Sequence, residues 1–152
     1  MSENENVQGS VVNSFDQKYP GLVSSWLPIF NFAERIGTKI PTIRGAIERG
    51  RLLGVCEGQS NVWLIPEKFI IPAHMSNPAD VGEPIINEEG KLKEVILPSL
   101  HGCVTQLRDQ KLSDEEILVW LFTKLEYLAQ SPIELLIEGN RSAVRRAAQF
   151  FG

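Results

Sequence analysis

The sequence predicts a mainly α-helical protein with one small β-hairpin, and three observations support this fold class. The last third of the chain contains short amphipathic segments with helix-capping residues at their ends. Around residue 40, two further helical segments are separated only by a tight turn. Directly after them, two β-prone runs flank a polar turn, a pattern typical of a hairpin. We therefore expect two helical parts, of which the N-terminal one also carries the hairpin.

Composition limits the class of protein. Of the 152 residues, 43% are hydrophobic and 22% are charged, which is ordinary for a globular chain. No apolar run approaches the roughly 18 residues that a membrane helix needs, and the first residues do not resemble a signal peptide. Cys56 and Cys103 are the two cysteines, and neither lies in a CxxC motif. These features predict a reduced, cytoplasmic protein that does not enter a membrane.

The N-terminal region, residues 1–25, is polar and predicts a disordered tail. Order is expected to begin at Trp26, where a first helix follows. Its apolar residues recur at helical spacing: Ile29, Phe32, Ala33 and Ile36. Gly37 is suited to end this helix because glycine adopts a positive φ without strain.

A second helix is expected at about residues 39–49, with Thr38 as its cap and Pro41 in its first turn. Its apolar face consists of Ile40, Ile43 and Ile47. A hairpin is expected at residues 52–65, where two short β-prone runs are joined by the polar turn "EGQSN". A helix-turn-helix followed at once by a hairpin is a winged helix, so residues 26–69 are predicted to form one, with the hairpin as the wing.

The rest of the chain divides into an irregular and a helical part. Residues 70–97 contain three prolines and several acids and predict a linker or an irregular excursion. Residues 98–152 predict a compact domain of four short helices. Two of these begin with the spacing of a capping box, Ser113 with Glu116 and Ser131 with Glu134.

Several sequence motifs resemble a known family. They are "SDEEILVWLF" (113–122), "SPIELLIEGN" (131–140) and "AVRRAAQ" (143–149), preceded by "WL" (26–27), the helix pair and "LL" (52–53). The chain resembles a family of small actinobacterial DNA-binding proteins, best known from mycobacteria, that join a winged helix-turn-helix to a C-terminal helical domain. The helix pair and wing are also similar to those of MerR regulators and phage excisionases. The resemblance extends from about Trp26 to the C-terminus, apart from the middle excursion.

This resemblance implies a non-enzymatic DNA-binding protein without a cofactor, such as a transcriptional regulator or a nucleoid-associated factor. The recognition helix would be about residues 39–49 and the wing residues 52–65, both contacting double-stranded DNA. The candidate DNA-binding residues are Lys39, Thr42, Arg44, Arg49, Arg51, Gln59, Ser60 and Asn61. Two features differ from the family pattern. Gly45 stands where members usually carry a long polar side chain, and the wing tip lacks arginines.

Charge is distributed unevenly along the chain. The formal net charge is −4, which disfavours attraction to DNA over long distances. Residues 26–69, however, carry six basic and four acidic residues and form the only segment of the predicted four with a net positive charge. A recognition helix needs such donors on its polar face to reach base edges and phosphates. The polar face of the second helix, with Arg44 and Arg49, meets this requirement.

A second hypothesis is a protein-interaction module. The C-terminal motifs are also similar to those of some antitoxins, whose helices bind a partner protein. An exposed apolar patch would favour this reading, and the candidate residues are Trp120, Phe122, Leu125, Tyr127 and Leu128. The last helix is expected to expose Arg141, Arg145 and Arg146 as a solvated face, or as a second contact to phosphate or to a partner.

Catalysis and metal binding are not expected. His101 and Cys103 are two positions apart, so on a helix they point in different directions. The run of acids at residues 114–116 fits the first turn of a helix, where the helix dipole favours negative charge. No glycine-rich phosphate loop is present.

Regulation by phosphorylation is a third hypothesis. The candidate hydroxyl groups are those of Ser10, Ser14, Thr38 and Thr42. A phosphate beside the recognition helix would repel DNA. A Thr42→Glu variant with unchanged DNA affinity would argue against this hypothesis.

Overall fold

The computed structural model describes residues 13–57 and 61–150. Within these ranges the fold is mixed, with seven α-helices and two small antiparallel sheets, one of three strands and one of two. The sheets contain more strands than the single hairpin that the sequence predicts. One continuous cluster of buried side chains connects the N-terminal elements with the C-terminal helices.

The chain is ordered earlier than predicted. Helix α1 (Ser14–Lys18) begins at Asn13, whose side chain accepts a hydrogen bond from the backbone of Asp16 at 2.8 Å. Phe15 is buried and packs edge-on against Trp26, with ring centroids 5.5 Å apart. The prediction of a disordered tail is therefore wrong for residues 13–25, because Phe15 and Val23 are buried in the core and Trp26 donates to Asp16 at 3.0 Å. Residues 1–12 lie outside the described ranges.

The strands of the first sheet come before and after the two predicted helices in the sequence. Strand β1 (Trp26–Pro28) leads directly into helix α2 (Ile29–Ile36) and pairs with β3 (Val62–Pro66), which also pairs with β2 (Val55–Glu57). The sequence predicts the β2–β3 hairpin but misses β1, and it places the first hairpin strand about three residues too early. Helix α2 ends at Gly37, whose φ of 74° confirms its predicted role.

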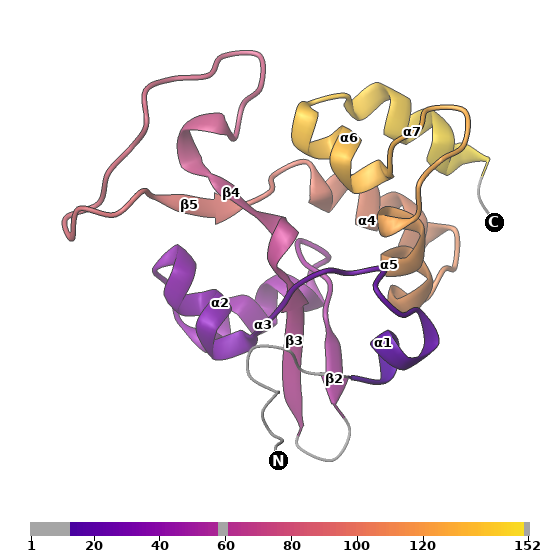
Figure 1. Ribbon diagram of the computed structural model, residues 1–152, viewed down its shortest axis with the longest axis horizontal. Coiled ribbons are helices and arrows are strands. Elements are labelled where there is room, and N and C mark those ends of the chain that lie inside the picture. The colour runs from indigo at the N-terminus through magenta and orange to yellow at the C-terminus, as the bar shows by residue number, and fades with distance from the viewer. Residues whose placement is uncertain (1–12, 58–60, 151–152) are drawn as a thin grey trace.

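Helix α3 (Ile40–Glu48) follows Gly37 after a tight turn, as predicted. Its N-cap residue is Lys39, which forms no side-chain capping bond, so the prediction that Thr38 caps this helix is wrong. The order α2, α3, β2 and β3 is that of the predicted helix-turn-helix and hairpin (Figure 1).

The region predicted as an irregular linker begins and ends in a second sheet. Strand β4 (Ile70–Pro72) follows a short 3₁₀ turn at Glu67–Phe69 and pairs with β5 (Glu94–Ile96). Residues 73–93, here called the arm, extend from this sheet (Figure 1) and include a second 3₁₀ turn at Ala73–Met75. Pro78 of the arm lies close to Gly139 in the C-terminal part of the chain. The sequence shows only the prolines and acids of the arm, because the strand pairing joins residues about 26 positions apart, as in Ile70 with Ile96.

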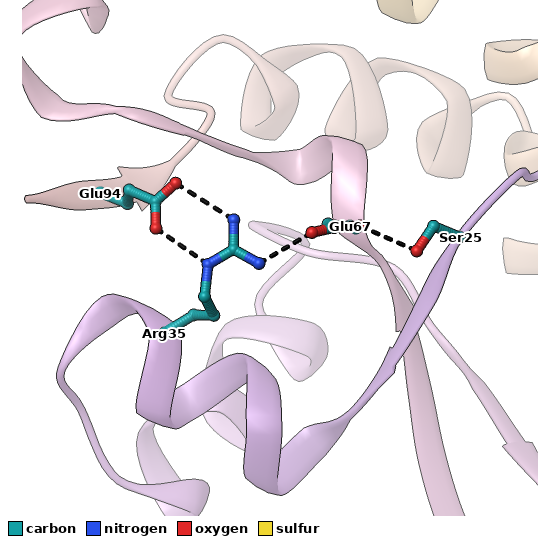
Figure 2. Close-up of polar contacts among 4 residues, drawn as sticks. All are labelled: Ser25, Arg35, Glu67 and Glu94. Carbon is teal, nitrogen blue, oxygen red and sulfur yellow. Dashed lines mark hydrogen bonds and ion pairs between the residues drawn. The ribbon is translucent and has the colours of Figure 1, made fainter. Parts of the chain in front are cut away.

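Charged side chains hold the base of the arm against α2 (Figure 2). Arg35, near the end of α2, donates to Glu67 at 2.8 Å and also to Glu94 on β5. The hydroxyl group of Ser25 donates to the other carboxylate oxygen of Glu67 at 2.8 Å. Ser25 directly precedes β1, Glu67 lies just before β4, and Glu94 is the first residue of β5. The network therefore joins both sheets to α2.

The C-terminal part consists of four helices, as predicted. They are α4 (Leu100–Asp109), α5 (Asp114–Phe122), α6 (Pro132–Glu138) and α7 (Arg141–Gln149). Both predicted capping boxes are formed, at Ser113 with Glu116 and at Ser131 with Glu134. Helix α1 reaches this part of the molecule, because Lys18 and Tyr19 both donate to Glu115 of α5. Within the described ranges, no helix has the length and apolar character needed to cross a bilayer.

Candidate nucleic-acid interface

Helix α3 has one buried and one exposed face. Ile43, Ala46 and Ile47 are buried, because they recur at helical spacing and pack into the core. Ile40, predicted to share this face, is only partly buried. The exposed side chains at and after the helix are those of Lys39, Thr42, Arg44, Arg49 and Arg51. The structure therefore brings these five candidate residues to one helix and the turn that follows it.

Among the described residues, the basic side chains of this surface have no acidic partners within ion-pair distance. Within the described ranges, the ion pairs are those of Lys18, Arg35 and Arg108, and none involves a basic residue of α3. Glu48 lies one turn after Arg44, but no salt bridge joins the two. The positive charge of Lys39, Arg44, Arg49 and Arg51 is therefore available to an external anion.

Gly45 has a role that the sequence did not indicate. A Cβ atom at this position would lie 2.9 Å from Nη2 and 3.2 Å from Nη1 of Arg49. The missing side chain thus lets the Arg49 guanidinium group lie over the helix surface.

The hairpin presents fewer candidate contacts. Asn61 is exposed and has a φ of 56°, and its side-chain oxygen accepts a hydrogen bond from the Cys56 thiol at 3.3 Å. Glu57, at the end of β2, accepts from the backbone nitrogen of Ser14 at 3.2 Å. The candidates Gln59 and Ser60 lie outside the described residues.

Sequence reasoning missed Arg108, which lies on α4 and reaches the end of α3. Its Nη1 donates to the carbonyl oxygen of Glu48 at 3.2 Å, and its Nη2 donates to that of Ile47 at 3.1 Å. Asp114, the first residue of α5, accepts from Nε and Nη2 of the same guanidinium group, each at 3.0 Å. No sequence spacing indicates this contact, because Arg108 and Ile47 are 61 positions apart.

The other predicted residues are placed as follows. Arg141, Arg145 and Arg146 are exposed on α7, as expected, opposite the buried Val144. His101 is exposed and Cys103 is buried, so the two side chains do point apart. Burial raises the pKa of the Cys103 thiol to about 12. Among the described residues, no group of three or more His, Cys, Asp or Glu side chains could hold a metal ion.

The apolar patch predicted for a protein-interaction module is largely covered. Trp120 and Phe122 belong to the buried core, and Leu125 and Leu128 pack partly against it. Tyr127 is the exposed member, at 73%. These five residues therefore do not form the exposed apolar patch that would favour this alternative.

Of the hydroxyl groups considered for phosphorylation, those of Ser14 and Thr42 are exposed and Thr38 is partly buried. Ser10 lies outside the described residues. The hypothesis of regulation by phosphorylation stays a prediction.

Comparison with known proteins gives one match. Residues 97–152 match the model of a family described as the Rv2175c C-terminal domain of unknown function. The matched residues correspond to helices α4 to α7 and the segments that connect them. No curated protein and no solved structure matches the chain. The C-terminal part is thus similar to this mycobacterial-named family, in agreement with the expected actinobacterial likeness, whereas α2, α3 and the hairpin lie outside the match.

Proposed function

We propose that this protein binds duplex DNA as a transcriptional regulator or nucleoid-associated factor. In this proposal α2, α3 and the β2–β3 hairpin form a winged helix-turn-helix, and α3 is the recognition helix. The proposal requires neither a cofactor nor catalysis.

The observation that carries the proposal is the exposed face of α3. Lys39, Arg44, Arg49 and Arg51 are all exposed on this helix and the turn after it, without acidic partners in the described ranges. By contrast, Arg35 and Arg108 are engaged with carboxylates. Unpaired basic side chains on one helix face can neutralise phosphates and reach base edges without first breaking an ion pair.

The dimensions of the helix suit a groove. Helix α3 has nine residues, which corresponds to a length of about 14 Å. The major groove of B-form DNA is about 12 Å wide and accepts a helix of this kind end-on or at an angle. The N-terminal backbone amides of α3 carry partial positive charge and add a site for a phosphate, beside Lys39 and Thr42.

The net negative charge of the chain determines the affinity and the salt dependence that we expect for DNA binding. With a net charge of −4, the molecule as a whole repels DNA, and binding must come from the local basic face. We therefore expect moderate affinity that falls steeply with salt. Neutralising three to six phosphates corresponds to a log–log salt slope of about −3 to −5.

The test is a titration of labelled duplex DNA, followed by fluorescence anisotropy at several salt concentrations. Arg44→Ala and Arg49→Ala should each weaken binding by about 1 to 3 kcal/mol and make the salt slope less steep by about 1. Lys91→Ala removes an equal charge from the exposed arm and serves as the matched control, with unchanged affinity expected.

Two results would contradict the proposal. One is the absence of binding even at low salt. The other is binding that neither arginine variant weakens, since the exposed face of α3 would then play no part.

A further inference from the structure

We infer that the C-terminal helices position the proposed recognition helix, α3, through Arg108. The part of the chain that matches a domain of unknown function would then help to present the DNA-binding surface. This inference rests on the proposed function, because it assigns a role to Arg108 in presenting α3. Arg108 is a positioning residue here, not a DNA contact.

Arg108 contacts backbone carbonyl groups at the C-terminal end of α3. The last four carbonyl oxygens of any α-helix lack helical partners and need other donors. Arg108 donates to two of them at the end of α3, those of Ile47 and Glu48, at 3.1 and 3.2 Å. Backbone amides of the turn after α3 donate to the carbonyls of Gly45, Ala46 and Ile47, and Arg108 adds bonds from α4 to Ile47 and Glu48. The C-terminal part of the molecule thus completes the cap at this end of α3.

Arg108 is itself held in place by Asp114. Asp114 accepts from Nε and Nη2 in a bidentate pair, each bond at 3.0 Å. Together with the bonds to α3, four of the five N–H donors of the guanidinium group are engaged. Because the planar guanidinium group is bonded on both sides, it sets the orientation of the end of α3 relative to Asp114 as well as the distance between them. It also has little capacity left for a DNA phosphate.

The positive charge of Arg108 complements the dipole of α3. The C-terminal end of a helix carries partial negative charge and is stabilised by a cation. The last turn of α3 has no basic residue of its own and contains Glu48, which adds to the negative charge. Arg49, the C-cap residue, lies over Gly45, and Arg108 adds a second cation from α4 that bonds to the last carbonyls. Asp114 lies in the first turn of α5, where negative charge is favourable, so the pair complements both helix ends.

The turn after α3 packs closely against α4 at Gly50. This residue has a φ of 80°, and a Cβ atom there would lie 3.3 Å from Nη1 of Arg108 and 3.6 Å from Val104. The turn after α3 therefore lies directly on α4. Gly50 is flanked by Arg49 and Arg51, two of the proposed DNA contacts. Fixing this turn fixes the direction in which both arginines leave the backbone.

Holding the turn after α3 in place affects DNA binding, because a helix end that is free to move must become ordered when DNA binds. The conformational entropy lost in that step reduces affinity without changing the number of phosphates contacted. Arg108 removes this cost in advance. Losing it should weaken DNA binding and leave the salt slope unchanged, which distinguishes it from the loss of a direct phosphate contact.

The first experiment needs no DNA. Hydrogen exchange is measured for the amides of Gly50 and Arg51, which donate to Ile47 and Ala46 at 3.2 and 2.8 Å. In Arg108→Gln and Asp114→Asn, these amides should exchange at least about tenfold faster than in wild type. The amide of Asn140, which donates to Leu135 in another part of the molecule, should keep its rate. Lys124→Gln is the matched control for loss of an exposed positive charge.

The second experiment repeats the DNA titration with the same variants. We expect about five- to tenfold weaker binding for Arg108→Gln and Asp114→Asn, with the wild-type salt slope. A slope reduced by about 1 in Arg108→Gln would overturn the inference and make Arg108 a phosphate contact. Unchanged affinity in both variants would also overturn it.

The two experiments separate this inference from the proposed function. If wild type fails to bind DNA, the proposed function fails, and the exchange rates alone decide whether Arg108 holds the end of α3. If Arg108→Gln does not fold, Asp114→Asn retains the arginine and removes only its anchor. Equal acceleration of exchange at Gly50 and Asn140 would show a general loss of stability and overturn the inference.

Discussion

The guanidinium group of Arg35 donates to both carboxylate oxygens of Glu94, from Nε at 2.9 Å and from Nη2 at 3.1 Å. Glu94 begins β5, the strand that closes the arm, whereas Arg35 lies at the end of α2. The third donor, Nη1, is used for Glu67 just before β4. Arg35 of α2 thus contacts one residue just before β4 and one at the start of β5, so the arm leaves the second sheet from a fixed base.

Removing Arg35 should therefore loosen the base of the arm. The Arg35→Ala variant loses one bidentate and one single ion pair, but the arginine side chain is 37% exposed, so solvent screens both. We expect the free energy of unfolding to fall by roughly 1 kcal/mol. Urea unfolding measures this change. The amide of Leu97, which donates to Phe69 beside the arm, should also exchange faster.

The control for this variant is Lys93→Ala, which removes a neighbouring exposed charge of the arm that is not in an ion pair within the described ranges. If the two variants unfold at the same urea concentration as wild type, the Arg35 contacts contribute nothing measurable.

A second prediction concerns pH. The hydrogen bonds from Arg35, and then from Ser25, lower the pKa of Glu67 below its ordinary value. A carboxyl group with a lowered pKa in the folded state stabilises the fold at pH values above its unfolded pKa of about 4.3. This contribution is lost as the pH falls through the lowered folded-state value. The stability difference between wild type and Glu67→Gln should therefore be largest at neutral pH and shrink below pH about 4.

Unfolding by urea at a series of pH values measures this difference. Glu83→Gln changes an exposed carboxylate on the arm and provides the comparison for general charge effects. A gap between wild type and Glu67→Gln that stays constant down to pH 3 would contradict the assigned cause.

The parts of the fold that the sequence predicts depend on local signals. Gly37 and Gly139 have φ values of 74° and 93°, as expected for residues that end helices, and both capping boxes are formed. These signals act between residues at most four positions apart. The exposed face of α3 was predictable for the same reason, because helical spacing alone separates Ile43 and Ile47 from Arg44.

The parts that the sequence misses depend on contacts between distant residues. Strand β1 exists because Trp26 pairs with Pro66, and the second sheet exists because Ile70 pairs with Ile96. Three-residue strands such as these carry too short a pattern to be recognised alone. The same limit applies to the candidate interface, where the Arg108 contact to Ile47 joins residues of different helices.

A third prediction separates the two cysteines. Burial raises the pKa of the Cys103 thiol to about 12, and the side chain is only 7% exposed. Because the thiolate is the reactive form, Cys103 should resist alkylation at pH 8 in the folded protein. Cys56 is partly exposed on the hairpin and should react first, by at least about tenfold. Mass spectrometry after limited iodoacetamide treatment, with Cys56→Ser as the reference, measures both rates.

In 6 M urea, the two cysteines should react at similar rates, because unfolding removes the burial. Rapid modification of Cys103 in folded protein would show that α4 opens far more readily than its packing implies.

The last prediction concerns Gly139, where two requirements coincide. Its φ of 93° strains any residue with a side chain, and a Cβ atom would lie 2.6 Å from the Cβ of Pro78 in the arm. Gly139→Ala should lower the free energy of unfolding by about 2 to 4 kcal/mol, the sum of backbone strain and steric overlap. Gly37→Ala is the matched control. It has a φ of 74° and nothing within 4 Å, so it should cost only the strain of about 1 to 2 kcal/mol.

The overlap can be isolated by combining Gly139→Ala with Pro78→Gly, which removes the atoms that the new methyl group would meet. In a double-mutant cycle, the two changes should show a favourable coupling of about 1 kcal/mol or more, because the overlap disappears and only the strain remains. A coupling near zero, with equal costs at Gly37 and Gly139, would mean that Pro78 moves aside freely. The arm would then be attached to the body mainly through Arg35 and the paired strands β4 and β5, not through the α6–α7 turn.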